Sequence, residues 1–204
     1  PDEDDWTIIA ERGSAQGQVD APYGLTVDEG GNLYVADTYN HRIQRLDAVT
    51  EEWSAWESGA GYGDKPGEFF QPKDVTLDAD GNVYVADGAN HRVQKLHADS
   101  GMWTYWGKIV PMSGTEPGEF YGAMGIAADQ AGNAYIADTS NDRIQKFTLE
   151  TGVWSEWAKP DGTEADDLGV FNKPHDVAVD EHGNVYVADT NNSRLLKLTA
   201  STGA

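Results

Sequence analysis

The sequence has no cysteine and few basic residues, and each shortage excludes a class of site or partner. Without cysteine the chain forms no disulfide and offers no thiolate ligand to a metal. Lysine and arginine together number 14 against 35 aspartate and glutamate residues, for a formal net charge of −21. Proteins that bind nucleic acid neutralise its phosphates with cationic side chains, so we expect no nucleic-acid partner.

Long apolar runs are also absent from the sequence. The longest span only a few residues, whereas a helix that crosses a bilayer needs about 20. We therefore expect no membrane insertion. The chain shows no signal peptide and begins with Pro1 instead of methionine, which suggests a processed or excised piece of a longer product.

What the sequence does contain is one motif written four times. Residues 31–46 read GNLYVADTYNHRIQRL, and close copies follow at 81–96, 132–147 and 183–198. The aspartates that precede each Gly-Asn pair are spaced 50, 51 and 51 residues apart, at Asp28, Asp78, Asp129 and Asp180. Such periods are typical of arrays in which each repeat is one supersecondary unit.

Each repeat is predicted to form four short strands. In the second repeat the apolar runs are 74–77, 83–87, 92–96 and 102–106, with turn residues between them and no helical periodicity. The YVAD run is apolar at consecutive positions, which indicates a strand covered on both faces. Paired tryptophans three residues apart place large rings on both faces of the outer strands. The pairs are Trp53 and Trp56, Trp103 and Trp106, and Trp154 and Trp157.

Sheets covered on both faces favour radially packed blades. We predict an all-β protein, a four-bladed β-propeller of four-stranded antiparallel blades, as a single domain over residues 1–204. The blades are expected at about 22–57, 72–107, 123–158 and 174–204.

The two ends of the chain predict how the ring closes. The fourth repeat ends without a tryptophan strand, and the stretch WTII precedes the first repeat without a blade of its own. Trp6 and Ile9 match the two tryptophan positions, so residues 6–10 (5–10 at most) are predicted to join the last blade as its outer strand. This closure predicts a monomer. A fragment of a larger propeller and a dimer of two open half-rings are the alternatives.

Features present in every repeat are interpreted as scaffold. In the Asp-x-x-Gly-Asn turns, glycine supplies positive φ and aspartate caps the turn, while the later ligands of a calcium loop are missing. The aspartates that end the second strands are expected to bind the hairpin backbone and to be held by arginines, with a ring of catalytic acids as the alternative. The pairs are Asp37 and Arg42, Asp87 and Arg92, Asp138 and Arg143, and Asp189 and Arg194.

The tryptophans and two histidines are also assigned to the scaffold. The tryptophans are expected to pack between blades, and a belt that stacks on sugars or peptides is the alternative. His41 and His91 lie in Asn-His-Arg turns and are expected to be exposed, because two histidines alone make a poor metal site.

Positions that differ between the repeats are the candidates for function. The first strand of each blade lines the channel of a propeller, and long loops at 58–71, 108–122 and 159–173 are expected on the same face, the usual place for binding. The residues that open the first strands are the predicted ligand-binding set. They are Tyr23, Lys73, Asp74, Met124, His175 and Asp176.

Asp74 and Asp176 are the predicted metal ligands. They belong to blades two and four, which face each other in a fourfold ring, and opposed carboxylates attract a hard cation such as Ca²⁺, with carbonyls or water completing the shell. The alternative is a water-filled mouth in which each aspartate caps its strand. No catalytic residue is assigned.

The repeat resembles the NHL repeat. Residues 174–198 read PHDVAVDEHGNVYVADTNNSRLLKL and show the family's Pro-x-Gly/Asp, Gly-Asn and Tyr-Val-x-Asp elements. The resemblance implies a β-propeller, commonly six-bladed, that acts mostly as an interaction platform. The amidating lyase of the family holds a catalytic zinc with histidines at the Pro-His position, and here only His175 matches. Similar arrays in secreted and cell-surface bacterial proteins imply an extracellular or cell-surface location.

Two functions follow as hypotheses from the sequence. The first is a non-catalytic module that presents its variable-loop face to a protein, peptide or glycan. The alternative is a metal-dependent hydrolase or lyase that uses Asp74, His175 and Asp176 around a cation at the channel mouth.

Overall fold

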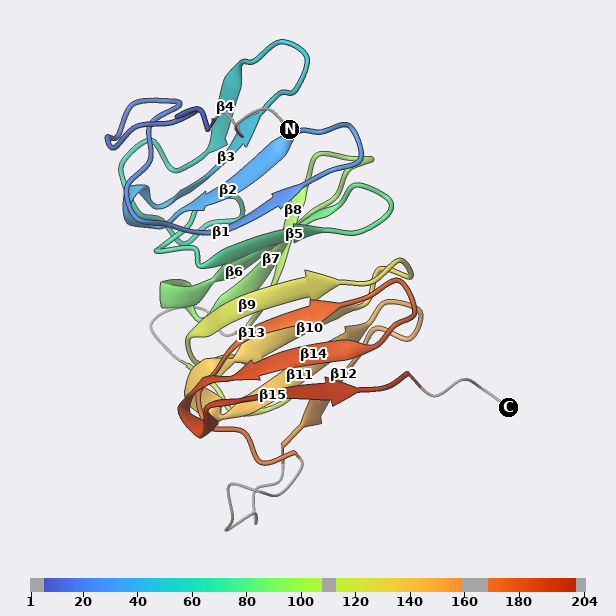
Figure 1. The fold of residues 1–204 in the computed structure, drawn as a ribbon. Coiled ribbons are helices and arrows are strands. Elements are labelled where there is room, and N and C mark those ends of the chain that lie inside the picture. The colour runs from blue at the N-terminus through green and yellow to red at the C-terminus, as the bar shows by residue number, and fades with distance from the viewer. Residues whose placement is uncertain (1–5, 108–112, 159–168, 201–204) are drawn as a thin grey trace.

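The structure is a computed structural model that describes residues 6–107, 113–158 and 169–200. These residues form four antiparallel sheets, three of four strands and one of three, arranged as a four-bladed β-propeller (Figure 1). The helical residues described are single 3-10 turns, and no helix in this part of the chain has the length and apolar character to cross a membrane. The all-β, four-bladed prediction is confirmed.

Within each blade the strands pair in the order of the sequence. Blade 1 contains β1 (Pro22–Val27), β2 (Leu33–Asp37), β3 (Arg42–Leu46) and β4 (Trp53–Trp56). Blade 2 contains β5 (Asp74–Leu77), β6 (Val83–Asp87), β7 (Arg92–Leu96) and β8 (Trp103–Gly107). Blade 3 contains β9 (Ala123–Ala128), β10 (Ala134–Asp138), β11 (Arg143–Thr148) and β12 (Val153–Trp157). Blade 4 contains β13 (Pro174–Val179), β14 (Val185–Asp189) and β15 (Arg194–Leu198).

A 3-10 turn follows the second strand of every blade. These turns are η1 (Thr38–Asn40), η2 (Gly88–Asn90), η3 (Thr139–Asn141) and η4 (Thr190–Asn192). The residue after each turn has positive φ, which reverses the chain into the third strand.

The first turn of each blade is built as its residues predict. In blade 1, Asp28 accepts hydrogen bonds from the backbone and side-chain nitrogens of Asn32, at 2.9 and 2.8 Å. Gly31 has a φ of 82°, a conformation that glycine adopts without strain. The Tyr34 hydroxyl donates to the same aspartate at 3.2 Å, which ties the turn to β2. Equivalent bonds recur in the other blades, so these turns are scaffold.

The core lies between the blades. One cluster joins Tyr34, Ala36 and Ile43 of blade 1 to Phe69, Val75, Val83 and Val85 of blade 2, and two further clusters join blade 2 to blade 3 and blade 3 to blade 4. The tryptophans extend these contacts at the outer edge. Trp56 meets Trp103 edge to face at a centroid distance of 6.0 Å, and Trp106 meets Trp154 at 5.9 Å. Each blade therefore supplies half of the core that it shares with its neighbour.

The structure departs from the predicted ring closure. Residues 6–10 form no strand, Trp6 is 93% exposed, and the last sheet has three strands. Blades 1 and 4 lie at opposite ends of the stack in Figure 1, with β1 against β5, β5 against β9, and β9 against β13. The segment leads directly into the loop that enters blade 1, which keeps it at that end of the stack. Closure by residues 6–10 within one chain is therefore corrected to an open array.

Candidate functional site

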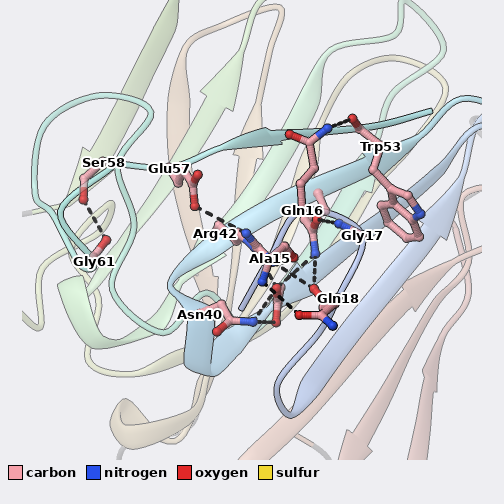
Figure 2. A network of polar contacts seen from close by, with 12 residues as sticks. Ala15, Gln16, Gly17, Gln18, Asn40, Arg42, Trp53, Glu57, Ser58 and Gly61 are labelled. Carbon is pink, nitrogen blue, oxygen red and sulfur yellow. Dashed lines mark hydrogen bonds and ion pairs between the residues drawn. The ribbon is translucent and has the colours of Figure 1, made fainter. Parts of the chain in front are cut away.

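The loops that enter the blades are clamped by the predicted Asp–Arg pairs. In blade 1 the Arg42 guanidinium donates from Nε to Asp37 at 2.8 Å. Its Nη2 atom donates to the backbone carbonyls of Ala15 and Gln18, each at 2.8 Å (Figure 2). The carboxylate neutralises a buried cation while the guanidinium satisfies loop carbonyls, so the pair fixes the path of the loop. The prediction that the arginines hold the aspartates is confirmed in all four blades.

A glutamine completes the clamp in blades 1, 2 and 3, and the sequence reasoning missed it. The Gln44 amide accepts from the Gly17 nitrogen at 2.9 Å and donates to the Gln18 carbonyl at 2.7 Å. Gln94 and Gln145 repeat these bonds in blades 2 and 3, whereas Leu196 takes the place in blade 4. The signal was present in the sequence, because Arg-x-Gln occurs in three repeats.

Close to the blades, the long loops are held in place by contacts with the blades. Phe69 and Phe120 are fully buried at their ends, and Gly67 lies against the Trp103 ring. Residues 108–112 and 159–168 of the predicted loops lie outside the described residues.

The six predicted ligand-binding residues line one shallow groove. Tyr23, Lys73, Asp74, Met124, His175 and Asp176 surround it together with Gly24 and Gly125, in a volume of about 190 Å³. The pairing of the first strand shifts register here in blades 1, 3 and 4, which re-aims the side chains at the strand start. These residues line the same groove because they occupy equivalent positions of the repeat, and equivalent positions of neighbouring blades lie side by side.

Asp74 links blade 2 to blade 3. Its carboxylate accepts from the Val75 nitrogen at 2.8 Å and, through the second oxygen, from the Ile126 nitrogen of β9 at 2.9 Å. Burial raises the pKa of Asp74 to about 7; these hydrogen bonds oppose the rise, and the negative charge of Asp176 adds to it. This carboxyl group therefore exchanges its proton near neutral pH.

The two aspartates flank one strand. Asp74 bonds to β9 from blade 2, and a Cβ built on Gly125 of β9 would lie 2.5 Å from Asp176 Oδ1 of blade 4. Because the array is open, the expected opposition across a fourfold ring is corrected to an approach from either side of β9. The described residues contain no group of three or more histidine, cysteine, aspartate or glutamate side chains placed to hold a metal.

Lys73 and Tyr23 bring an aromatic ring and a cation to the same groove. The Lys73 ammonium lies 4.3 Å from the centroid of the Tyr23 ring, within the range of a cation–π contact. Burial lowers the pKa of Lys73. The groove thus combines one cation, two carboxylates, an exposed histidine at His175 and apolar surface.

His41 and His91 differ from the expected exposed turn residues. His41 Nδ1 accepts from the Gln71 nitrogen of blade 2, and His91 Nδ1 accepts from the Gly122 nitrogen of blade 3, both at 3.1 Å. Burial lowers the pKa of both rings, although nearby carboxylates oppose the shift. Both histidines are half-buried and staple one blade to the next.

Exposed tyrosines gather on the face of the entering loops. Tyr62 stacks on Phe70 at a centroid distance of 4.7 Å, and Tyr121 meets His91 edge to face at 5.2 Å. Tyr39 lies in η1, whose backbone bonds to the loop that enters blade 1. With Tyr23, these rings are largely exposed, and none of them repeats in all blades.

The fold and its radial blades define the class of protein as a β-propeller. The family model described as NHL repeat matches residues 21–46, 69–96 and 171–198, in blades 1, 2 and 4. The chain therefore carries NHL repeats in three of its blades, and the predicted resemblance is confirmed.

Among curated proteins, the chain is similar to a probable peptidyl-α-hydroxyglycine α-amidating lyase of Caenorhabditis elegans. They are 32% identical over 84 residues, or 41% of this chain and 24% of the relative. A quarter of that protein's length is thus matched, and its activity is not carried over by the match.

Among solved structures, the chain resembles virginiamycin B lyase from Staphylococcus aureus, with a TM-score of 0.60 and 15% identity over 89% of this chain and 56% of that one. It also resembles an auxiliary nutrient binding protein from Bacteroides thetaiotaomicron, with a TM-score of 0.63 and 17% identity over 85% of this chain and 46% of that one. At these identities the likeness shows the fold, and the chain spans about half of either structure.

Proposed function

We propose that the chain is a binding module that presents its loop face to a protein, peptide or glycan partner. The observation that carries this is the set of exposed, blade-specific rings of the entering loops and turns, Tyr39, Tyr62 and Tyr121, together with Tyr23 in the groove. Tyrosine offers apolar stacking area and a polar tip, and ordering it costs little side-chain entropy. Rings held by packing, as Tyr62 is on Phe70, lose still less on binding.

The test is a screen of the labelled chain against glycan and peptide arrays, followed by Tyr62→Ser/Tyr121→Ser. We expect the double variant to lose at least about tenfold in affinity for the selected partner, a typical size for aromatic hot spots. Val49→Ser is the matched control, because Val49 is exposed in the β3–β4 turn and away from these rings. Unchanged affinity in a folded double variant would refute the proposal.

A second function, a metal-assisted lyase, is supported by a different observation. The sequence similarity to the amidating lyase is joined by His175, which is exposed in a groove beside two carboxylates. The experiment incubates the chain with a peptidyl-α-hydroxyglycine, with added Zn²⁺ or Ca²⁺, and follows the peptide amide by mass spectrometry. Turnover that disappears in His175→Ala supports the lyase, whereas no turnover with either metal leaves the binding module.

Asp74 and Asp176 are the residues that would hold Ca²⁺ in this groove. Each carboxylate already accepts a backbone amide, so a cation would use remaining lone pairs, with carbonyls and water completing the shell. Protons compete for Asp74 below about pH 7, so calorimetric titration should show tighter binding at pH 8 than at pH 6. Asp176→Asn should abolish the heat, and no heat in the unaltered chain at pH 8 would remove the site.

A location outside the cell or on its surface stays a proposal, and it rests on the resemblance of the repeat to arrays in secreted and cell-surface proteins. Protection of the chain from protease added to intact cells of its source would count against it.

A further inference from the structure

The two ends of the blade stack carry the two halves of the interface that joins blades inside it. At each internal interface one blade contributes a tyrosine, an alanine and a branched aliphatic residue, and the next contributes the facing apolar side chains. Blade 4 has the first half, at Tyr186, Ala188 and Leu195. Blade 1 has the second half, at Val19, Leu25, Leu33 and Val35.

Both halves contain side chains that lack a neighbour in the described structure, although Val35 of blade 1 is buried. Leu195 is 84% exposed, whereas its counterpart Ile144 in blade 3 is fully buried. Leu25 is 63% exposed, whereas its counterpart Val75 in blade 2 is 2% exposed. Apolar side chains that are core in the middle of the stack therefore form exposed patches at its ends.

A polar pattern also continues from one end to the other. The positions that open the first strands read Gly24, Asp74, Gly125 and Asp176 along the stack. A Cβ on Gly24 would lie 2.0 Å from Asp74 Oδ1, so glycine makes room for the aspartate of the following blade. Asp74 then bonds to the nitrogen after the next glycine, at Ile126. For Asp176, a following blade of the blade 1 type offers the corresponding nitrogen at Leu25.

The blade staples extend in the same direction. The acceptors His41, His91 and Asp142 bind the nitrogens of Gln71, Gly122 and Lys173 in the following blades, at 3.1, 3.1 and 2.8 Å. The fourth acceptor position is Ser193, and the corresponding donor position is Ala21 at the entry to blade 1. Ala21 has the positive φ of this position, 46°, close to 49° at Gln71 and 48° at Lys173.

Trp6 supplies a further match. Trp6 lies 50 residues before Trp56, the same spacing that separates Gly13 from Gly63. In the repeat, Trp6 is therefore the equivalent of Trp56, and it would belong to the blade that precedes blade 1. Trp56 pairs with Ile43 and stacks on Tyr34 at 6.3 Å. The counterparts on blade 4 are Leu195 and Tyr186, which a Trp6 side chain from a docked blade 1 would cover.

We propose that blade 4 of one copy docks on blade 1 of a second copy, so that two copies close an eight-bladed ring. A second copy is the occupant that provides the glycine, the apolar face, the staple donor and the tryptophan at once. Head-to-tail contacts close into a ring when the rotation permits, and propellers of up to eight blades are known. This chain matches about half the length of each of the two similar structures. Two copies of the chain therefore supply an amount of sheet comparable with one of those structures.

The first measurement is the mass of the 204-residue chain by size-exclusion chromatography with light scattering, from about 1 to 200 µM. Salt at about 0.3 M limits repulsion between two chains of net charge −21. We expect twice the chain mass of 22.1 kDa. Leu195→Glu and Leu25→Glu should each give 22.1 kDa, and Val49→Glu should leave the pair intact. Both altered leucines are exposed in the single chain, and circular dichroism checks that the variants fold.

Mixing the two variants distinguishes this interface from a symmetric one. Leu25→Glu retains an intact blade 4 and Leu195→Glu retains an intact blade 1, so an equal mixture should form a pair. In a symmetric dimer of like ends, one of the two single variants would stay dimeric and the mixture would gain nothing. A single mass of 22.1 kDa at every concentration overturns the proposal and leaves further blades of a longer chain as the occupant of both ends.

Discussion

Blade 2 and blade 4 share the second-strand sequence VYVAD, yet the strands have different surroundings. Tyr84 of β6 is fully buried, whereas Tyr186 of β14 is 39% exposed. The strands have the same length and the same pairing with the third strand of their sheet. The difference comes from blade 3, which covers blade 2, while no described blade covers blade 4. A repeat therefore specifies a face, and its neighbour decides whether that face becomes core.

The largest difference between a covered and an uncovered blade face should appear when one side chain on each face is truncated. Ile144→Ala should lower the free energy of unfolding by about 2–5 kcal/mol, because it leaves a cavity between blades 3 and 4. Leu195→Ala should change it by no more than about 0.5 kcal/mol, as for other exposed positions. Urea unfolding at a protein concentration where the chain is monomeric measures both values. Equal losses would mean that Leu195 is covered within one chain.

A substitution in the clamp should show how much the glutamine that blade 4 lacks contributes to the stability of blade 2. Gln94→Leu copies blade 4 into blade 2 and leaves the Gly67 nitrogen and the Glu68 carbonyl without the amide that they bind. The expected loss is about 1–3 kcal/mol, the cost of unsatisfied buried polar groups. Gln94→Glu retains an acceptor for Gly67 but places a second carboxylate beside buried Asp87, to which the amide donates at 3.0 Å, so it should cost at least as much. A neutral Gln94→Leu would show that water replaces the amide.

The histidine staples should make the interior of the stack sensitive to acid. Burial lowers the pKa of His91 in the folded state below its unfolded value of about 6.5, so the stabilisation is complete above that pH. It is lost as the pH falls below about 6.5 and through the lower folded value, by about 1 kcal/mol for one hydrogen bond. His91→Asn keeps an acceptor and should flatten this slope between pH 7 and 5, with the remainder due to His41. An unchanged slope would exclude His91 as its source.

Asp74 should give an effect of the opposite sign. Its folded pKa of about 7 lies above the unfolded value of 3.8, so the folded chain holds an extra proton between these values. Its contribution to stability is complete below about pH 4 and is lost as the pH rises to about 7. Asp74→Asn should remove this fall, in unfolding curves measured from pH 4 to 8, even if the variant is less stable throughout. A fall that persists in the variant would point to another group.

Much of the fold could be predicted because its determinants are local. The Gly-Asn turns, the YVAD runs and the tryptophan pairs each report on a few neighbouring residues, and the period of about fifty residues assembles them into blades. The groove followed from the same period, because the residues that open the first strands are equivalent in every blade. The glutamine clamp and the histidine staples were not predicted. Their partners lie about 26 to 31 residues away, in loops whose path only the folded chain shows.

The sequence by itself determined the strands, the turns and the number of blades, because hydrogen-bonded turns and alternation between strand faces depend on residues close together in the chain. The tertiary structure decided how the blades end. Residues 6–10 have the composition of an outer strand, but an outer strand needs a neighbour with open backbone groups, and in this chain that neighbour lies at the far end of the stack. Whether the two ends meet depends on the curvature summed over all blades, a property that no single repeat contains.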